Sequence, residues 1–177
     1  NEKYEIDVAQ DLESKMEAYQ LMYQLYRSPE IDYAKEDPSE MWYSLFNADV
    51  NTTTLIVREL SSRKIVATLS MVIDSLLGLP MEENFPEEIR ALRNKNRKCA
   101  EIISLGFDDV VRGSNEILIQ LFKFSYLVYR GIHSVTDLLI MIKPGHSKFY
   151  EKRLLFKTIG GEVNCHKINN KPVVLKH

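Results

Sequence analysis

Two apolar, strand-like runs separated by one long helical stretch constrain the fold of this chain most. The runs are "CAEIISLGF" (99–107) and "TDLLIMIK" (136–143), both rich in β-branched and other apolar residues. Residues 115–132, between them, carry apolar side chains on nearly every side of a helix, which is typical of a well-covered helix. Strands joined in this way lie parallel in one sheet, because such crossovers are right-handed almost without exception.

The remaining segments are expected to extend this pair into a mixed sheet. "TTTLIVREL" (52–60) and "KIVATLSMVID" (64–74) are joined by "SSR" and predict an antiparallel hairpin. Further strands are expected at 3–9, 156–166 and 171–176, and further helices after Asp11, around Ser39, at 86–95 and at 144–154. The predicted class is α/β (α+β mixed sheet) with helices on both faces, in a single domain over residues 1–177.

Composition excludes several classes of function. The net charge of −2 argues against a nucleic-acid-binding surface over the whole protein. The longest apolar run is "LLIMI" (138–142), too short to be a transmembrane segment. Cys99 and Cys165 lack the partners of a zinc or redox motif, so we expect buried, reduced thiols and no metal. The sequence begins at Asn1 without a methionine, so we expect it to be trimmed there, and we expect a cytoplasmic protein.

This order of elements, with the residues that fill it, resembles the GNAT N-acyltransferase superfamily. Within it, the chain looks most like the N-acyl amino acid synthases, which are related to the acyl-homoserine-lactone autoinducer synthases. The phrases that carry the resemblance are "YQLMYQLY" (19–26), "TTTLIV" (52–57), "ATLSMVIDSLLGLPMEENFPEEIRALR" (67–93), "CAEIISLGF" (99–107), "KPGHSKFYEKRLLF" (143–156) and "INNKPVVL" (168–175).

The resemblance implies an N-acyltransferase that moves a medium or long acyl chain from an acyl carrier protein thioester to the α-amino group of an amino acid. Acyl carrier protein would be the partner, acyl-coenzyme A the second choice of co-substrate, and no cofactor would be tightly bound. Two departures bear on this. "VVRGSNE" (110–116) misses the spacing of the GNAT coenzyme A loop, and Ser104 stands where autoinducer synthases carry an arginine. Two alternatives stay open: an acyl- or acetyl-coenzyme A-dependent acetyltransferase, and a non-catalytic acyl-binding module.

Glu101 and Tyr150 are the expected catalytic residues. Glu101 lies inside an apolar strand, where a carboxylate is costly to bury and needs a reason. It would accept a proton from the attacking amine; the alternative is a structural ion pair, for example with Arg58. In GNAT enzymes a tyrosine at the helix position of Tyr150 can protonate the departing thiolate; the alternative is an aromatic core residue.

The resemblance also indicates where the acyl donor binds. The backbone of Ser104, Leu105, Gly106 and Phe107 would bind a pantetheine arm and polarise the thioester carbonyl, where parallel strands splay apart. Arg112, Gly113 and Ser114 precede a helix N-terminus, which suits an anion such as the pantetheine phosphate. The alternatives are an ordinary central strand and an ordinary helix start.

The remaining candidates surround these. Tyr23, Tyr26, Trp42 and His146 are the expected acceptor and acyl pocket, although aromatic residues at helical spacing are commonly core residues. Arg93, Arg97 and Lys98 lie in the basic run "RALRNKNRK" (90–98) and are the expected docking residues for the acidic carrier protein. The alternative for that run is a solvated charged surface.

Overall fold

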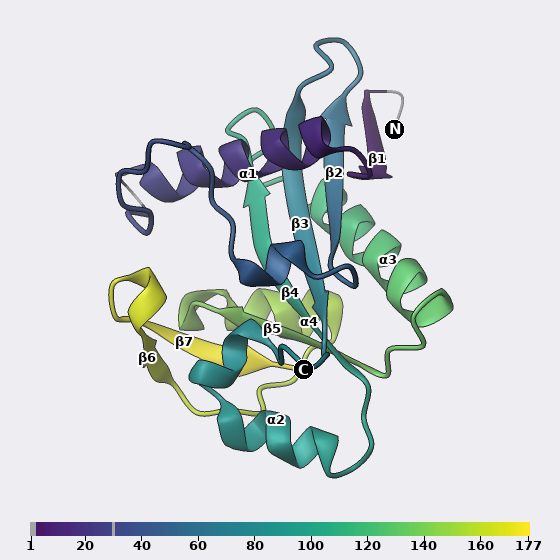
Figure 1. Ribbon diagram of the computed structural model, residues 1–177, viewed down its shortest axis with the longest axis vertical. Helices are drawn as coiled ribbons and strands as arrows, with labels where there is room; N and C mark the ends of the chain where they lie inside the picture. The colour runs from purple at the N-terminus through teal and green to yellow at the C-terminus, as the bar shows by residue number, and fades with distance from the viewer. Residues whose placement is uncertain (1–2, 30) are drawn as a thin grey trace. The chain divides into compact units, whose positions relative to one another are not determined.

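The computed structural model of the chain describes residues 3–29 and 31–177 (Figure 1). Its strands are β1 (Tyr4–Val8), β2 (Thr53–Glu59), β3 (Ile65–Ile73), β4 (Cys99–Phe107), β5 (Asp137–Ile142), β6 (Val163–Cys165) and β7 (Lys171–Lys176). Its α-helices are α1 (Leu12–Arg27), α2 (Pro86–Arg93), α3 (Asn115–Gly131) and α4 (Ser147–Leu154). Short 3₁₀ helices are η1 (Leu45–Ala48), η2 (Pro80–Glu83), η3 (Pro144–His146) and η4 (His166–Ile168).

The strands form a mixed sheet in the order β1-β2-β3-β4-β5-β7-β6. β4 and β5 pair in parallel, from Cys99 opposite Asp137 to Ile102 opposite Ile140, which confirms the predicted crossover. The β2–β3 hairpin is antiparallel as predicted, and β1–β2, β5–β7 and β6–β7 are antiparallel as well. The predicted fold class is therefore confirmed.

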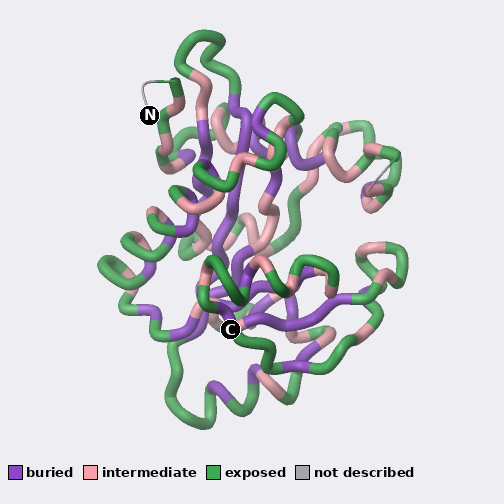
Figure 2. Tube along the Cα trace, turned by 180° about the vertical axis from the view of Figure 1, so that it is seen from behind, coloured by how far each residue is buried: buried purple, intermediate pink, exposed green. Residues whose placement is uncertain are grey.

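The chain forms two compact units. Unit 1 comprises Asn1–Met71 and Ser104–Ser125, and unit 2 comprises Val72–Ile103 and Tyr126–His177. The strands β3 and β4 and the helix α3 each contribute residues to both units. Figure 2 shows that buried residues run along the strands, while much of the connecting chain is exposed.

Unit 1 is organised by α1, which lies across its strands in Figure 1. The side chain of Asp11 accepts the N–H of Ser14 at 2.7 Å and so caps the helix start. Ala18 and Leu21 then pack against Ile56 of β2 and other apolar residues in one buried cluster. Such a buried face, more than helix propensity, is what stabilises a helix of this length.

Gly106 of β4 allows α1 to approach the strand closely. A Cβ atom at this position would lie 2.4 Å from Sδ of Met22 and 2.7 Å from Cδ1 of Leu25. The glycine expected to admit a pantetheine arm is therefore also needed for packing within unit 1.

Two predicted elements are wrong. The helix expected around Ser39 is absent, and Trp42 lies in an irregular segment before η1. Asp37 accepts both the N–H and the hydroxyl of Ser39, and Glu40 then adopts a φ of 51°, so the chain makes one turn and stops. The strand expected over 156–166 shrinks to β6, with an isolated bridge at Thr158, because Gly160 and Gly161 interrupt it.

Both cysteines are buried free thiols, as predicted. Burial raises the pKa of the Cys99 thiol to about 12, so it stays protonated and is a poor nucleophile. None of the helices within residues 3–29 and 31–177 is long and apolar enough to cross a membrane.

Candidate active site

Glu101 is a buried carboxylic acid in the central strand β4. Glu101 is 1% exposed, and its Oε2 accepts a hydrogen bond from the backbone N–H of Met81 at 2.8 Å. Met81 belongs to η2, in the long connection between β3 and α2. No described residue donates a hydrogen bond to the other oxygen, Oε1. The side chain therefore keeps one acceptor oxygen available in unit 2.

The pKa of Glu101 is raised to about 8, because burial disfavours its charged form. The hydrogen bond from Met81 and the positive charge of Lys167 act in the opposite direction and stabilise the carboxylate. Glu82 raises the pKa slightly through like-charge repulsion. A carboxyl group with this pKa exchanges protons near neutral pH, as a general base requires.

The ion pair with Arg58, considered as a structural role for Glu101, is not formed. The guanidinium of Arg58 binds Glu17 at 2.9 Å and the carbonyl of Arg63. In that place it joins α1 to the β2–β3 hairpin inside unit 1. Glu101 therefore remains a buried acid whose one recorded hydrogen-bond partner, among the described residues, is a neutral backbone amide.

Tyr150 is the one residue of α4 that is fully buried, whereas Phe149 and Leu154 are only partly buried. Its ring makes edge-to-face contacts with Phe149 and Phe156, at centroid distances of 5.8 Å and 6.0 Å. Burial raises the pKa of the Tyr150 phenol to about 12, so it carries its proton at every working pH. Such a phenol can donate a hydrogen bond or a proton but cannot act as a base.

The end of α4 is fixed around Tyr150. Its carbonyl accepts the N–H groups of Leu155, which adopts a left-handed conformation, and of Phe156. The next residue, Glu151, binds the buried ammonium of Lys176 on β7 at 2.6 Å, and Lys176 also donates to Thr158 at 2.5 Å. A salt bridge thus joins α4 to β7 immediately beside the candidate acid. The sequence analysis did not single out Lys176, since a lysine near the end of a strand usually faces solvent.

The backbone of β4 changes at Ser104, where φ is 50°. A non-glycine residue in this left-handed region is unusual inside a strand and makes the backbone irregular there. The recorded ladder with β5 ends at Ile102, and Ile103, Ser104 and Leu105 are less buried than the residues before them. The predicted pantetheine-binding stretch, Ser104 to Phe107, thus begins with an irregular backbone, and its binding role stays a prediction.

The loop Arg112, Gly113 and Ser114 precedes α3, as predicted. Gly113 has a φ of 81°, which favours glycine, and Oγ of Ser114 accepts the N–H of Ile117 at 3.3 Å as a helix cap. Arg112 forms an exposed ion pair with Asp109 at 2.7 Å. The side chain expected to bind phosphate is therefore already paired with a neighbouring acid.

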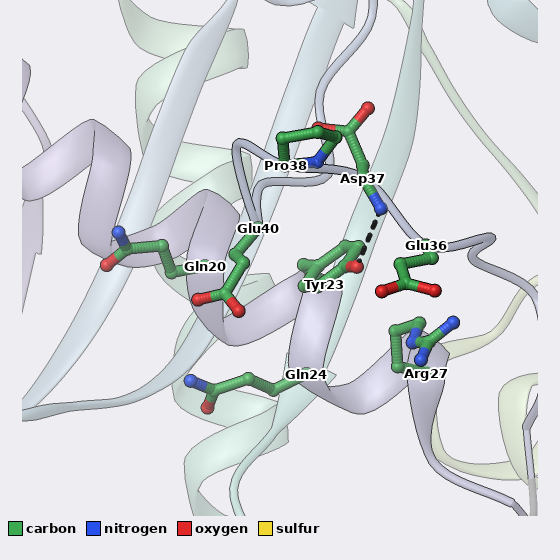
Figure 3. Close-up of a pocket in the computed structure, with 8 residues that line it drawn as sticks. All are labelled: Gln20, Tyr23, Gln24, Arg27, Glu36, Asp37, Pro38 and Glu40. Atoms are coloured by element: carbon green, nitrogen blue, oxygen red, sulfur yellow. Dashed lines mark hydrogen bonds between the residues drawn. The ribbon is translucent and has the colours of Figure 1, made fainter.

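A groove of about 920 Å³ lies along the second half of α1 in unit 1 (Figure 3). Tyr23 is buried in its wall, and the Tyr23 hydroxyl accepts the backbone N–H of Asp37 at 3.0 Å. The lining is polar and charged: Gln20, Tyr23, Gln24, Arg27, Glu36, Asp37, Pro38 and Glu40. Charges of both signs suit a polar solute and do not suit an acyl chain.

Tyr26 and Trp42, also predicted for the pocket, are in contact with each other. Their rings meet edge to face at 4.9 Å, and Tyr26 also packs against Tyr33 at 5.4 Å. They form an aromatic cluster and do not line the groove. His146 is exposed before α4 in unit 2 and makes no side-chain cap. The four predicted pocket residues are thus divided between the two units.

The three predicted docking residues differ in their availability. Arg93 binds the carboxylates of Asp74 and Glu82, and Nε of Arg97 binds Asp137 at 2.5 Å. Lys98 is exposed, and no described residue pairs with its ammonium group. Two of the three charges therefore already serve contacts inside unit 2.

Comparison with known proteins decides the family. A profile of the N-acyl amino acid synthase FeeM matches residues 17–177, which is most of the chain. The chain belongs to the FeeM N-acyl amino acid synthase family. It is accordingly an N-acyltransferase with the GNAT fold. No curated protein matches the chain.

Solved structures of the same fold agree with this assignment. FeeM, an N-acyl amino acid synthase from uncultured soil microbes, is 22% identical with a TM-score of 0.83, over 98% of this chain and 89% of its own. The AHL synthase LasI is 16% identical with a TM-score of 0.64, over 98% and 87% of the two chains. An acyl-CoA N-acyltransferase from Pseudomonas aeruginosa is 12% identical with a TM-score of 0.63, over 98% and 96%. At these identities the likeness shows the fold.

The candidate site also contains a backbone group that the sequence did not reveal, the N–H of Met81. It comes from a residue 20 positions before Glu101, in a connection without regular periodicity. A backbone donor leaves no residue-type signal, so only the presence of "DSLLGLPM" as a distinct phrase could have drawn attention to this segment.

Proposed function

We propose that this synthase transfers a medium or long acyl chain from the phosphopantetheine thioester of acyl carrier protein to the α-amino group of an amino acid. The observation that carries the proposal is Glu101, a buried carboxylic acid with one amide hydrogen bond and one oxygen without a described donor. Native proteins rarely retain so poorly compensated an acid unless it has a task.

Glu101 acts on the acceptor. The amine attacks the thioester carbon as the neutral base, and the new C–N bond leaves a positive charge on nitrogen. Oε1 of Glu101 accepts a proton from this nitrogen, and the C–S bond then breaks to release the thiolate. An α-amino group titrates near ~8, so a carboxylate with a pKa of about 8 matches the proton it takes.

Tyr150 acts on the leaving group. Its phenol has a pKa of about 12, whereas a thiol titrates near ~8.5, so complete proton transfer to the thiolate is uphill. The phenol therefore contributes mainly by donating a hydrogen bond to the sulfur as negative charge develops. Thiolates leave readily, so this contribution is modest beside the orientation of the reactants.

The donor side favours a carrier protein over free coenzyme A. Coenzyme A carries several phosphates, whereas the pantetheine arm of a carrier has one. Arg112 is paired with Asp109, and Asp108 and Glu116 add negative charge around the start of α3. Negative charge here disfavours the several phosphates of coenzyme A more than the single phosphate of a carrier's pantetheine arm. We place the carrier's docking surface on the run 90–98, with Lys98 as its most available charge.

Thiol release decides between the candidates. Purified protein is given acyl carrier protein or coenzyme A loaded with chains of eight to sixteen carbons, and each is combined with single amino acids; mass spectrometry identifies the product. We expect N-acyl amino acid to form from the carrier at more than ten times the kcat/KM for coenzyme A. Equal efficiency with both donors would contradict the donor assignment. If no amino acid gives an amide product, the proposal that the acceptor is an amino acid is wrong.

The second candidate, an acyl-coenzyme A-dependent enzyme, rests on one observation: the loop before α3 retains Gly113 in the left-handed conformation that such turns need. It predicts the opposite order of donors in the same assay. The cytoplasmic location stays a prediction from the sequence.

A further inference from the structure

One arginine in unit 2 holds both ends of the connection that reaches Glu101. Arg93, the last residue of α2, donates to the two oxygens of Asp74 from Nε at 2.8 Å and Nη2 at 2.6 Å. Its Nη1 donates to Oε2 of Glu82 at 2.8 Å, and Nη2 also contacts Oε1. We call Arg93, Asp74 and Glu82 the Arg93 clamp. A guanidinium forked onto two carboxylates has a defined geometry that a lysine cannot reproduce.

The clamp shapes the chain between its two acids. The N–H of Asp74 donates to the carbonyl of Cys99 at 3.0 Å, which fixes the first end against β4. Oε1 of Glu82 also accepts the N–H of Leu79 at 2.6 Å, which closes η2. Gly78 has a φ of 74°, and a Cβ there would lie 2.5 Å from the same Oε1. The glycine is therefore required for Glu82 to reach its place.

The segment held in this way ends on Glu101. Met81, next to Glu82, is fully buried, and its N–H points to Oε2 of Glu101 at 2.8 Å. Leu79 is buried as well, so apolar packing keeps the segment folded while the clamp sets its backbone. Arg93 is thus connected to Glu101 by a chain of contacts: its guanidinium binds Glu82, Glu82 holds the 3₁₀ turn η2, and the Met81 N–H of that turn binds Glu101.

We propose that the Arg93 clamp is a positioning device that aims the Met81 N–H at Oε2 of Glu101 and so leaves Oε1 to the incoming amine. This inference rests on the proposed function, in which Glu101 is catalytic. It makes Arg93 a positioning residue for Glu101. The clamp residues act on Glu101 through Met81 and do not contact the attacking amine.

Charged groups around Glu101 give the sign of the expected change. Lys167 of η4 favours the carboxylate, and Glu82 disfavours it. Lys167 is itself paired with Glu83 at 2.7 Å, and His166 lies near Glu83. Releasing the clamp removes the Met81 hydrogen bond from the carboxylate and leaves Glu82 without its cation. Both changes raise the pKa of Glu101.

The amide of Met81 offers a direct measurement that does not need turnover. The chain has six methionines, so protein labelled with ¹⁵N-methionine gives a simple amide spectrum, and Met81→Leu assigns the relevant signal. This signal should titrate with Glu101, with a midpoint near the pKa of about 8. Glu101→Gln should abolish that titration.

Two variants release the clamp in different ways. Arg93→Gln removes the guanidinium, and Gly78→Ala displaces Glu82 without altering any charge. Each should raise the midpoint by about one pH unit, the usual effect of one lost amide hydrogen bond to a carboxylate. The low-pH limb of kcat should move by the same amount. Arg93→Lys, which keeps the charge, should give a smaller shift. Arg90→Gln breaks the exposed pair with Glu87 on the same helix and should keep the wild-type midpoint.

The outcomes separate the possibilities. A wild-type midpoint in Arg93→Gln, or one moved down, overturns the inference, even if the KM for the carrier rises because Arg93 serves docking. A shift in Arg93→Gln that Gly78→Ala does not share also overturns it, because the effect is then one of charge alone. If Glu101→Gln turns over normally, the proposed catalytic role fails, while the titration of the Met81 amide still reports whether the clamp positions it.

Discussion

Glu101 and Asp137 are two buried acids on the neighbouring parallel strands β4 and β5, and their surroundings differ sharply. They are 1% and 3% exposed, so burial alone does not distinguish them. Asp137 accepts hydrogen bonds from Arg97, Thr136 and His177, each at 2.5 Å, and its pKa is lowered in spite of burial. Glu101 has the single amide of Met81, and its pKa is raised.

The difference indicates how a catalytic buried acid can be told from a structural one. Asp137 is surrounded by a guanidinium, an imidazole and a hydroxyl that keep it charged. It therefore joins the start of β5 to the segment before β4 and to the residue after β7. Glu101 is buried without such compensation, so it gains and loses a proton near neutral pH. The number of donors around a buried carboxylate, more than its burial, indicates which of the two serves chemistry.

The largest effect on kcat should follow substitution of Glu101, the proposed general base. Glu101→Gln keeps the side chain's size but removes the base, and we expect kcat to fall about 10²- to 10⁴-fold. Wild-type kcat should rise with pH through about 8 as Glu101 ionises. Asp137→Asn, the matched control, should retain kcat within a few-fold per folded molecule. Steady-state assays from pH 6 to 10 measure this, and equal losses in both variants would erase the distinction.

The two acids should also have opposite effects on stability. The pKa of folded Glu101 lies above its unfolded value of 4.5, so the folded state holds the extra proton and loses stability as pH rises from about 4.5 to 8. The pKa of folded Asp137 is depressed, so its contribution is present above its unfolded pKa and is lost as pH falls through the folded one.

Urea unfolding at several pH values tests these signs. Asp137→Asn should cost about 2–3 kcal/mol at neutral pH, as expected for charged hydrogen bonds lost from a buried acid. Glu101→Gln should cost little at pH 5 and should be more stable than wild type at pH 9. A Gln variant that is less stable at pH 9 than at pH 5, relative to wild type, would show that Glu101 is a structural acid.

Tyr150 extends the comparison to a buried group that keeps its proton. Tyr150→Phe removes only the phenol oxygen, so kcat should fall about 10- to 10²-fold, at or below the lower end of the general-acid range. Stability should change by less than about 1.5 kcal/mol, because the ring contacts with Phe149 and Phe156 remain. Phe149→Leu serves as the packing control. A Phe variant with wild-type kcat would leave Tyr150 as a core aromatic residue.

The smallest effect is expected for the exposed charge of Lys98, which is neither buried nor paired with a described residue. Lys98→Glu should raise the KM for acyl carrier protein a few-fold at low salt, and less at physiological salt where exposed charges are screened. Lys95→Glu, at a nearby exposed position, shows whether the whole run contributes. Indifference of both variants at low ionic strength would remove this surface from consideration as the docking site.

Most of the fold could be predicted because its signals are local and periodic. The apolar strands β4 and β5 and the helix between them predict a parallel pair, and the β-branched hairpin predicts two further neighbouring strands. What failed depends on single backbone conformations: the φ of 51° at Glu40 ends a turn that looked like a helix start. Ser104 and Leu155 adopt left-handed conformations that no residue type announces.

The site was predictable only in part, for a related reason. An acid inside an apolar run can be noticed in the sequence, and so can a tyrosine at a family-like helix position. The number of donors around the acid cannot, because Met81 contributes a backbone N–H from 20 residues away. The pairing of Arg93 with Asp74 and Glu82 is equally invisible, since all three look like ordinary surface charges in the sequence.

The left-handed backbone at Ser104 has a consequence for how relatives of this enzyme are compared. Side chains of a regular strand alternate between two faces, and a residue in the left-handed conformation interrupts that alternation. The half of β4 with Glu101 and the half with Gly106 can therefore drift apart in sequence, each under the demands of its own surroundings. An alignment of homologous sequences should therefore not impose strict two-residue periodicity through Ser104.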